Sequence, residues 1–179
     1  MLMTNILIIL TLCIMVFLEL YTFIKLKTQI RILPALLKSE DNNYYYYSMR
    51  NSFKKTGLIL FKVDIENQLY NFLIDTGANV NLLSDTLFDK LSYSGTLTGD
   101  STLVNFSENP SSINKNAIIN FSIANKAYSN IEFVLGDCNA FNMQETYGID
   151  LHGVLGSIFL QENNWVIDYE KLLIKIPKI

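Results

Sequence analysis

The distribution of apolar residues divides the chain into an N-terminal apolar run, a polar connector and a longer region of short alternating segments. The run covers residues 6–24 and is interrupted only by Thr11, Glu19 and Thr22. A helix of that length would span about 28 Å, close to the hydrocarbon thickness of a bilayer. No basic residue precedes the run and no small-residue cleavage site follows it. We therefore predict an uncleaved transmembrane anchor within residues 1–27, rather than a signal peptide.

A polar connector is expected over residues 28–53. The basic residues that flank the apolar run all follow it, which favours a cytoplasmic location for the rest of the chain. These residues are Lys25, Lys27, Arg31 and Lys38. The tyrosine tract 44–47 has two interpretations: it lies at the level of the lipid headgroups, or it is a low-complexity spacer.

From residue 54 onward the pattern is mainly that of β-strands separated by turn residues. Three pairs of segments are typical of hairpins: 58–66 with 69–74, 117–123 with 131–135, and 165–169 with 172–176. We also expect a strand over 80–84, a helix over 85–91 with Ser84 as its N-cap, and a strand that turns into a short helix over 153–160. About eight short strands at this spacing favour one all-β domain, closed or sandwich-like, over residues 54–179.

The charge of this domain argues against nucleic-acid binding. The whole chain has 14 basic and 17 acidic residues, of which five basic and three acidic ones precede position 51, leaving 9 against 14 and a net charge of −5. Neutralisation of phosphate supplies most of the affinity for nucleic acid, so an acidic domain is a poor candidate.

Histidine and cysteine are too scarce for several classes of catalytic site. The chain has one histidine, His152, and two cysteines, Cys13 and Cys138. A zinc site built from these types would need all three, although Cys13 lies in the predicted anchor. We interpret His152 as an incidental polar residue and Cys138 as a small semi-buried one. The prediction is that the protein uses no metal or cofactor and that carboxylates are its available catalytic groups.

The most informative stretch is an apolar segment that runs directly into Asp75, Thr76, Gly77 and Ala78. Gly77 permits a tight turn, and the Thr76 hydroxyl and Gly77 amide lie beside the acid. A strand end of this kind can hold a carboxylate in a fixed, partly desolvated position, as acid–base chemistry requires. Taken alone, the motif is also compatible with an ordinary turn at the end of a strand.

A second motif, Val154, Leu155 and Gly156, comes later in the domain and leads into a segment of helical character. Together the two motifs resemble the retropepsin-like aspartic proteases, the single-lobe, retroviral-type family. In that family the aspartate of the first motif is catalytic, and the apolar-apolar-glycine segment packs beside the catalytic loop. The resemblance extends over residues 58–176 and implies an acid-protease-like closed β-barrel with one or two short helices.

The resemblance also implies a homodimer. Aspartic catalysis needs two carboxylates that share a proton, and this chain carries one such motif. Asp75 from each copy would therefore meet on a two-fold axis, one activating water and the other binding the peptide carbonyl. Thr76 would cross-link the two loops, and Gly77 would help hold the carboxylates coplanar. A protein or peptide substrate would bind as an extended strand, so the implied function is a membrane-anchored aspartic endopeptidase.

Two further expectations stay open at this stage. The family closes a hairpin flap over its substrate, and the matching segment here, 93–107, is poor in glycine, with Thr98, Gly99 and Asp100 as its expected tip. That segment is either a lid or a solvated loop. Residues 165–176 are expected in the core and in the dimer interface. The alternative function is a non-catalytic, membrane-tethered domain of the same fold that binds an extended peptide or a partner protein; the intact motif at Asp75 argues against it.

Overall fold

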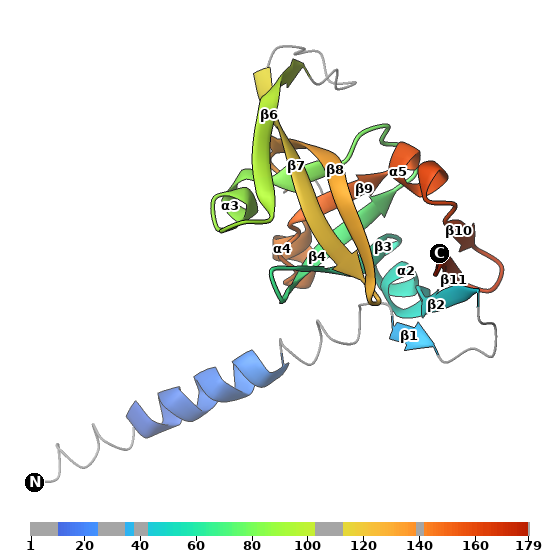
Figure 1. The fold of residues 1–179 in the computed structure, drawn as a ribbon. Helices are drawn as coiled ribbons and strands as arrows, with labels where there is room; N and C mark the ends of the chain where they lie inside the picture. Colours follow the sequence, from blue (N-terminus) through green and yellow to red (C-terminus); the bar gives the residue numbers. More distant parts are fainter. Residues whose placement is uncertain (1–10, 25–34, 38–42, 103–112, 139–141, 179) are drawn as a thin grey trace, which may run out of the picture.

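The computed structural model describes residues 11–24, 35–37, 43–102, 113–138 and 142–178, and these form an all-β fold with several short helices (Figure 1). The larger sheet contains β3 (Ile59–Ile65), β4 (Gln68–Asp75), β5 (Leu82–Ser84), β6 (Gly95–Thr102), β7 (Ile113–Ile123), β8 (Lys126–Gly136) and β9 (Gly153–Gly156). The smaller sheet contains β1 (Ala35–Leu37), β2 (Tyr44–Ser48), β10 (Val166–Asp168) and β11 (Leu173–Pro177). The short helices are α2 (Arg50–Thr56), α3 (Asp85–Phe88), α4 (Met143–Tyr147) and α5 (Ser157–Glu162).

The larger sheet closes into a barrel. Its strand order among the described residues is β3-β4-β9-β5-β8-β7-β6, and β3 also pairs with β7 through Asp64 and Ser122. That pairing joins the ends of a six-stranded ring, and β6 extends beyond it from β7 (Figure 1). Closure removes exposed sheet edges, and the predicted closed all-β domain is confirmed.

Tight turns position the long hairpins. Glu66 and Asn67 join β3 to β4 with φ of 55° and 63°, and Ala124 and Asn125 join β7 to β8 with φ of 52° and 67°. Positive φ at both central residues matches the right-handed twist of antiparallel strands, and asparagine tolerates this conformation best among residues other than glycine.

The second half of strand β4, residues 71–74, is buried on both faces, and this sets the environment of the residue at its end. Phe72 and Ile74 belong to the main core cluster, which fills the barrel, whereas Leu73 packs in a second cluster with Val154 and Met143 of α4. Successive side chains of a strand point to opposite faces, so one apolar run can serve both clusters. Asp75, the last residue of β4, therefore comes directly after a segment that is shielded from water on each side.

The smaller sheet gives the tyrosine tract a structural role. β2 pairs antiparallel with β11, with Tyr47 opposite Ile174, and Tyr47 is buried against Phe61 at a ring-centroid distance of 4.6 Å. Neither expected interpretation, a headgroup-level tract or a spacer, anticipated a strand here. Part of the predicted connector thus lies within the folded structure, together with helix α2, which ends at Gly57 with φ of 72°.

The predicted anchor is only partly covered by the described residues. Residues 11–24 are helical and their side chains are exposed. Within the part of the chain that the structure describes, which excludes 1–10 and 25–34, no helix is long and apolar enough to cross a membrane.

Other elements separate into those that local pattern predicted and those it did not. The helix after Ser84 is confirmed, since the Ser84 hydroxyl accepts a hydrogen bond from the amide of Leu87 at 3.1 Å, although helix α3 ends at Phe88. The described residues contain four short helices, more than the one or two expected. Helices α2 and α4 were not predicted because their sequences carry no strong helical periodicity.

Candidate active site

Asp75 is the last residue of β4 and lies at the end of a parallel pairing with β9, directly opposite Gly156. Its side chain is half-buried, and its Oδ1 accepts a hydrogen bond from the amide of Gly77 at 2.9 Å. The amide of Ala78 donates to the Asp75 carbonyl at 3.2 Å. The carboxylate is therefore oriented by its own turn while it still reaches solvent, which is the combination that acid–base chemistry uses.

Glycine at position 77 leaves space for the Asp75 carboxylate. A Cβ atom there would lie 3.2 Å from Oδ1 of Asp75, tighter than most such contacts. Gly77 is not among the glycines with positive φ, so the expected need for a special turn conformation is wrong and the tight contact is the reason for glycine here. Thr76, beside it, is exposed, so its hydroxyl is accessible to a second molecule.

The second motif holds the far end of the loop that follows Asp75. We call residues 75–81 the Asp75 loop. Both the amide and the hydroxyl of Ser157 donate to the carbonyl of Ala78, at 2.7 and 2.8 Å. The amide of Gly156 donates to Oδ1 of Asn81 at 2.9 Å. A Cβ at Gly156 would meet the carbonyl of Ala78 at 2.9 Å and would also collide with that of Val80.

The structure thus brings the two predicted motifs together. Val154 and Leu155 are buried on opposite faces of β9, one in each apolar cluster, and they carry Gly156 to the loop. Asn81 and Ser157 are functional candidates that the sequence argument missed. The available signal for Asn81 was a single polar residue within an apolar strand segment, and for Ser157 a hydroxyl directly after the glycine.

Asn81 also reaches a third strand. Its Nδ2 donates to the carbonyl of Glu132 in β8 at 3.0 Å, while Oδ1 holds Gly156. One amide side chain therefore ties together the end of the Asp75 loop, β8 and the β9–α5 junction.

The expected flap tip is in a different kind of structure. Thr98, Gly99 and Asp100 lie inside strand β6, where Gly99 pairs with Asn116 and the register shifts between Leu97 and Gly99. They do not form a turn. The connection from β6 to β7 falls at 103–112, outside the described residues, so the rest of the expected segment is not placed. The polar composition of β6 gives no sign of a strand in the sequence. Its strand conformation comes from pairing with β7.

The base of β6 is held by a carboxylate in the β3–β4 turn. Glu66 accepts hydrogen bonds from the amides of Ser92, Tyr93 and Ser94, the shortest at 2.7 Å. These bonds, that of Tyr93 above all, lower the pKa of Glu66 below its ordinary value. A carboxylate that accepts several backbone amides is stabilised in its charged form.

His152 and Cys138 do not form a nucleophilic pair. Burial raises the pKa of the Cys138 thiol to about 12, so it stays protonated at neutral pH. Burial is also the largest cause that lowers the pKa of His152. The His152 ring meets Tyr70 edge-on at 5.1 Å, and its Nδ1 has no hydrogen-bond partner among the described residues. Cys138 is fully buried rather than semi-buried as expected.

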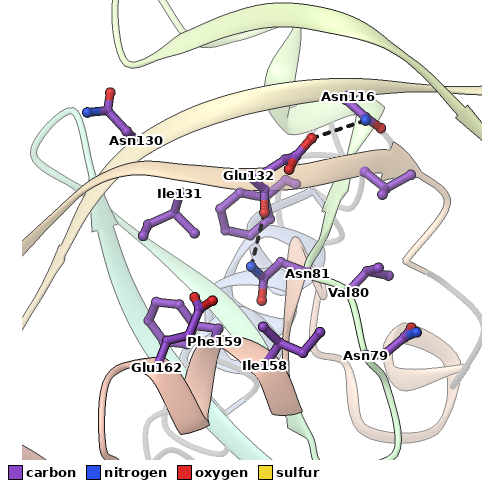
Figure 2. Close-up of a pocket in the computed structure, with 12 residues that line it drawn as sticks. Asn79, Val80, Asn81, Asn116, Asn130, Ile131, Glu132, Ile158, Phe159 and Glu162 are labelled. Carbon is purple, nitrogen blue, oxygen red and sulfur yellow. Dashed lines mark hydrogen bonds between the residues drawn. The ribbon is translucent and has the colours of Figure 1, made fainter.

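The described residues contain no group of three histidine, cysteine, aspartate or glutamate side chains that could hold a metal ion. A pocket of about 490 Å³ adjoins the Asp75 loop, but Asp75 does not line it (Figure 2). Its walls are Asn79–Asn81, strand β8 and helix α5, with Asn116 of β7 at its rim. In a single chain, then, this pocket and the Asp75 carboxylate are neighbouring but separate features.

Comparison with known proteins gives structural similarity without sequence similarity. No protein-family model matches the chain, and no curated protein matches it. Among solved structures, the chain is similar to the EIAV protease in complex with the inhibitor HBY-793, with a TM-score of 0.44 and 16% identity, over 57% of this chain and 85% of that one.

Two further structures are similar at the same level. A retropepsin-like aspartic protease from Rickettsia conorii has a TM-score of 0.43 and 20% identity, over 79% of this chain and 87% of that chain. The retroviral protease-like domain of Ddi1 from Leishmania major has a TM-score of 0.44 and 9% identity, over 66% of this chain and 87% of its own.

Proposed function

We propose that this protein is an aspartic endopeptidase. In it, the two Asp75 residues of a homodimer form one catalytic pair that activates a water molecule for attack on a peptide bond. The observation that carries the proposal is the position of Asp75: a half-buried carboxylate at the end of a doubly covered strand, oriented by the Gly77 amide and opposite Gly156. A strand that merely ended in a surface turn would not need its loop held by three hydrogen bonds from the β9–α5 junction.

The chemistry requires a second carboxylate. In the proposed dimer one aspartate is the base that takes a proton from water, and the other, protonated, donates a hydrogen bond to the scissile carbonyl. The exposed Thr76 hydroxyl would contact the partner loop. β10 has a neighbour on one side only among the described strands, so its free edge is available for contact between copies within residues 165–176.

Membrane anchoring and location are part of the proposal. Residues 11–24 form a helix whose apolar side chains are exposed all round, including Phe17 at 74%. A helix that is apolar on every face is typical of a membrane environment. Two copies confined to one bilayer would meet at a raised effective concentration, which would favour a weak dimer. The basic residues after the run place the domain on the cytoplasmic side in this proposal.

The experiment compares the full chain with Asp75→Asn on a mixture of unstructured proteins, with fragments identified by mass spectrometry. We expect the substitution to lower the cleavage rate at least about a hundredfold, since it removes the acid–base group. Circular dichroism of both chains checks that the fold is retained. A statine-type peptide should inhibit the unsubstituted chain, because it mimics the tetrahedral intermediate. Equal cleavage by the two chains would exclude the proposal.

A further inference from the structure

The pocket of Figure 2 adjoins the loop that carries the proposed catalytic carboxylate, although Asp75 itself does not line it. Asn79 is the first loop residue that lines it, only four positions after Asp75. Four residues of fully extended chain span at most about 14 Å between Cα atoms. The Asp75 loop spans less than this, because it turns where the Ala78 amide donates to the Asp75 carbonyl. An extended peptide bound at Asp75 and following the loop would reach it.

The lining combines an apolar floor with two carboxylates. Ile158 of α5 is 49% exposed here although it is a large apolar residue, and Phe159 and Val134 lie beside it. Glu162 has no hydrogen bond or ion pair to any described residue. Glu132 has only Asn116 as a side-chain partner, which donates to its Oε1 at 3.2 Å.

The charge of the pocket is one-sided. Its described lining contains Glu132 and Glu162, four asparagines and no lysine or arginine. An occupant that fits both features has an apolar stem and a cationic head. Lysine and arginine side chains have this form, since their methylene stems lie along apolar surface while the charged group stays at the polar rim.

We propose that this pocket binds a lysine or arginine side chain of an extended polypeptide substrate, at most about four residues from the scissile bond. This upper limit follows from the rise of about 3.3 Å per residue in an extended substrate, set against the largest possible span from Asp75 to Asn79. Glu132 and Glu162 are the specificity-determining residues. The inference rests on the proposed function for the position of the scissile bond, but binding in the pocket can be measured without cleavage.

The test uses the full chain in detergent with Asp75→Asn, so that bound peptides are not cleaved. The probes are fluorescent, extended peptides that are otherwise uncharged and carry a single lysine, placed at each position in turn. A matched set carries a single norleucine at the same positions. Norleucine keeps the apolar stem and removes the charge. We expect lysine to bind about fivefold more tightly than norleucine at one position, as two partly exposed ion pairs allow.

Glu132→Gln combined with Glu162→Gln should remove that preference, and Glu145→Gln combined with Glu170→Gln, both exposed and outside the pocket, should retain it. Circular dichroism confirms that each variant is folded. The absence of a lysine preference at every position, or a preference that survives the first double substitution, overturns the inference. Cleavage by the chain with Asp75 intact is measured separately. A lysine preference without cleavage would contradict the proposed function alone. Cleavage without the preference would contradict the pocket assignment alone.

Discussion

Gly156 donates its backbone amide to Oδ1 of Asn81 at 2.9 Å, and this bond ties the second sequence motif to the far end of the Asp75 loop. Asn81 uses its other amide atom to hold the Glu132 carbonyl. The loop that begins with Asp75 is thus held at its far end by residues that do not themselves contact a reacting group. Perturbing these contacts should change catalysis through geometry.

Asn81→Ala should lower both stability and cleavage. The substitution leaves the Gly156 amide and the Glu132 carbonyl without their partner, at a cost of about 1–3 kcal/mol when such groups are partly buried. Asn81→Asp keeps the acceptor for Gly156 and should recover part of the activity. Urea denaturation and kcat measure the two effects. Asn51→Ala, exposed and outside the pocket, is the matched control; equal effects of the two alanine substitutions would contradict this role of Asn81.

Gly156→Ala should be strongly destabilising. Its Cβ would meet the backbone carbonyls of Val80 and Ala78, which cannot rotate away as a side chain could. Overpacking of this kind costs about 1–3 kcal/mol. Gly136→Ala is the control, since nothing lies within 4 Å of its Cβ position. Thermal unfolding should show a clearly lower Tm for the first variant only; unchanged Tm for Gly156→Ala would show that the loop is not packed as described.

Glu66→Gln should loosen the base of β6. The neutral amide is a weaker acceptor for the amides of Ser92, Tyr93 and Ser94, so these should exchange hydrogen faster than in the unsubstituted chain, whereas Glu170→Gln should leave them protected. The pKa of Glu66 is lowered in the folded state. Its contribution to stability is therefore present above its ordinary value of 4.5 and is lost as the pH falls through the folded-state pKa. Protection that is the same in both variants would mean that the carboxylate does not hold the loop.

The pH dependence of stability should carry a contribution from His152. Burial lowers its pKa below 6.5, with Lys62 and Lys90 acting in the same direction and Asp150 against it. The unfolded chain therefore binds this proton first, and stability should fall as the pH drops below about 6.5. His152→Gln should flatten this part of the curve, measured by urea midpoints on either side of that pH. Parallel curves for the two chains would exclude the contribution.

Local pattern was sufficient where a residue's role is set by its neighbours in sequence. The buried strand that leads into Asp75, the cap at Ser84 and the glycine-containing strand before α5 follow from alternation, capping chemistry and short motifs. Each of these is decided within a few residues, which is the range over which propensity acts.

Elements that depend on distant partners were not predictable in this way. β6 is polar and is a strand because β7 pairs with it, and the tyrosine tract is a strand because β11 pairs with it. Asn81 has its role only when Gly156 and Glu132 come to it from other strands. Such long-range pairing is a tertiary property, so a single sequence does not reveal it.

The most direct test of the central claim, a catalytic pair shared between two copies of Asp75, is a subunit-mixing titration. Full chains with Asp75 and with Asp75→Asn are mixed in detergent at constant total concentration, and the cleavage rate is followed against the fraction of the first. A shared pair predicts that the rate follows the square of that fraction, so that an equal mixture retains about a quarter of the full rate. A rate that falls in direct proportion, to about one half at equal mixing, would contradict the account, because each chain would then act alone.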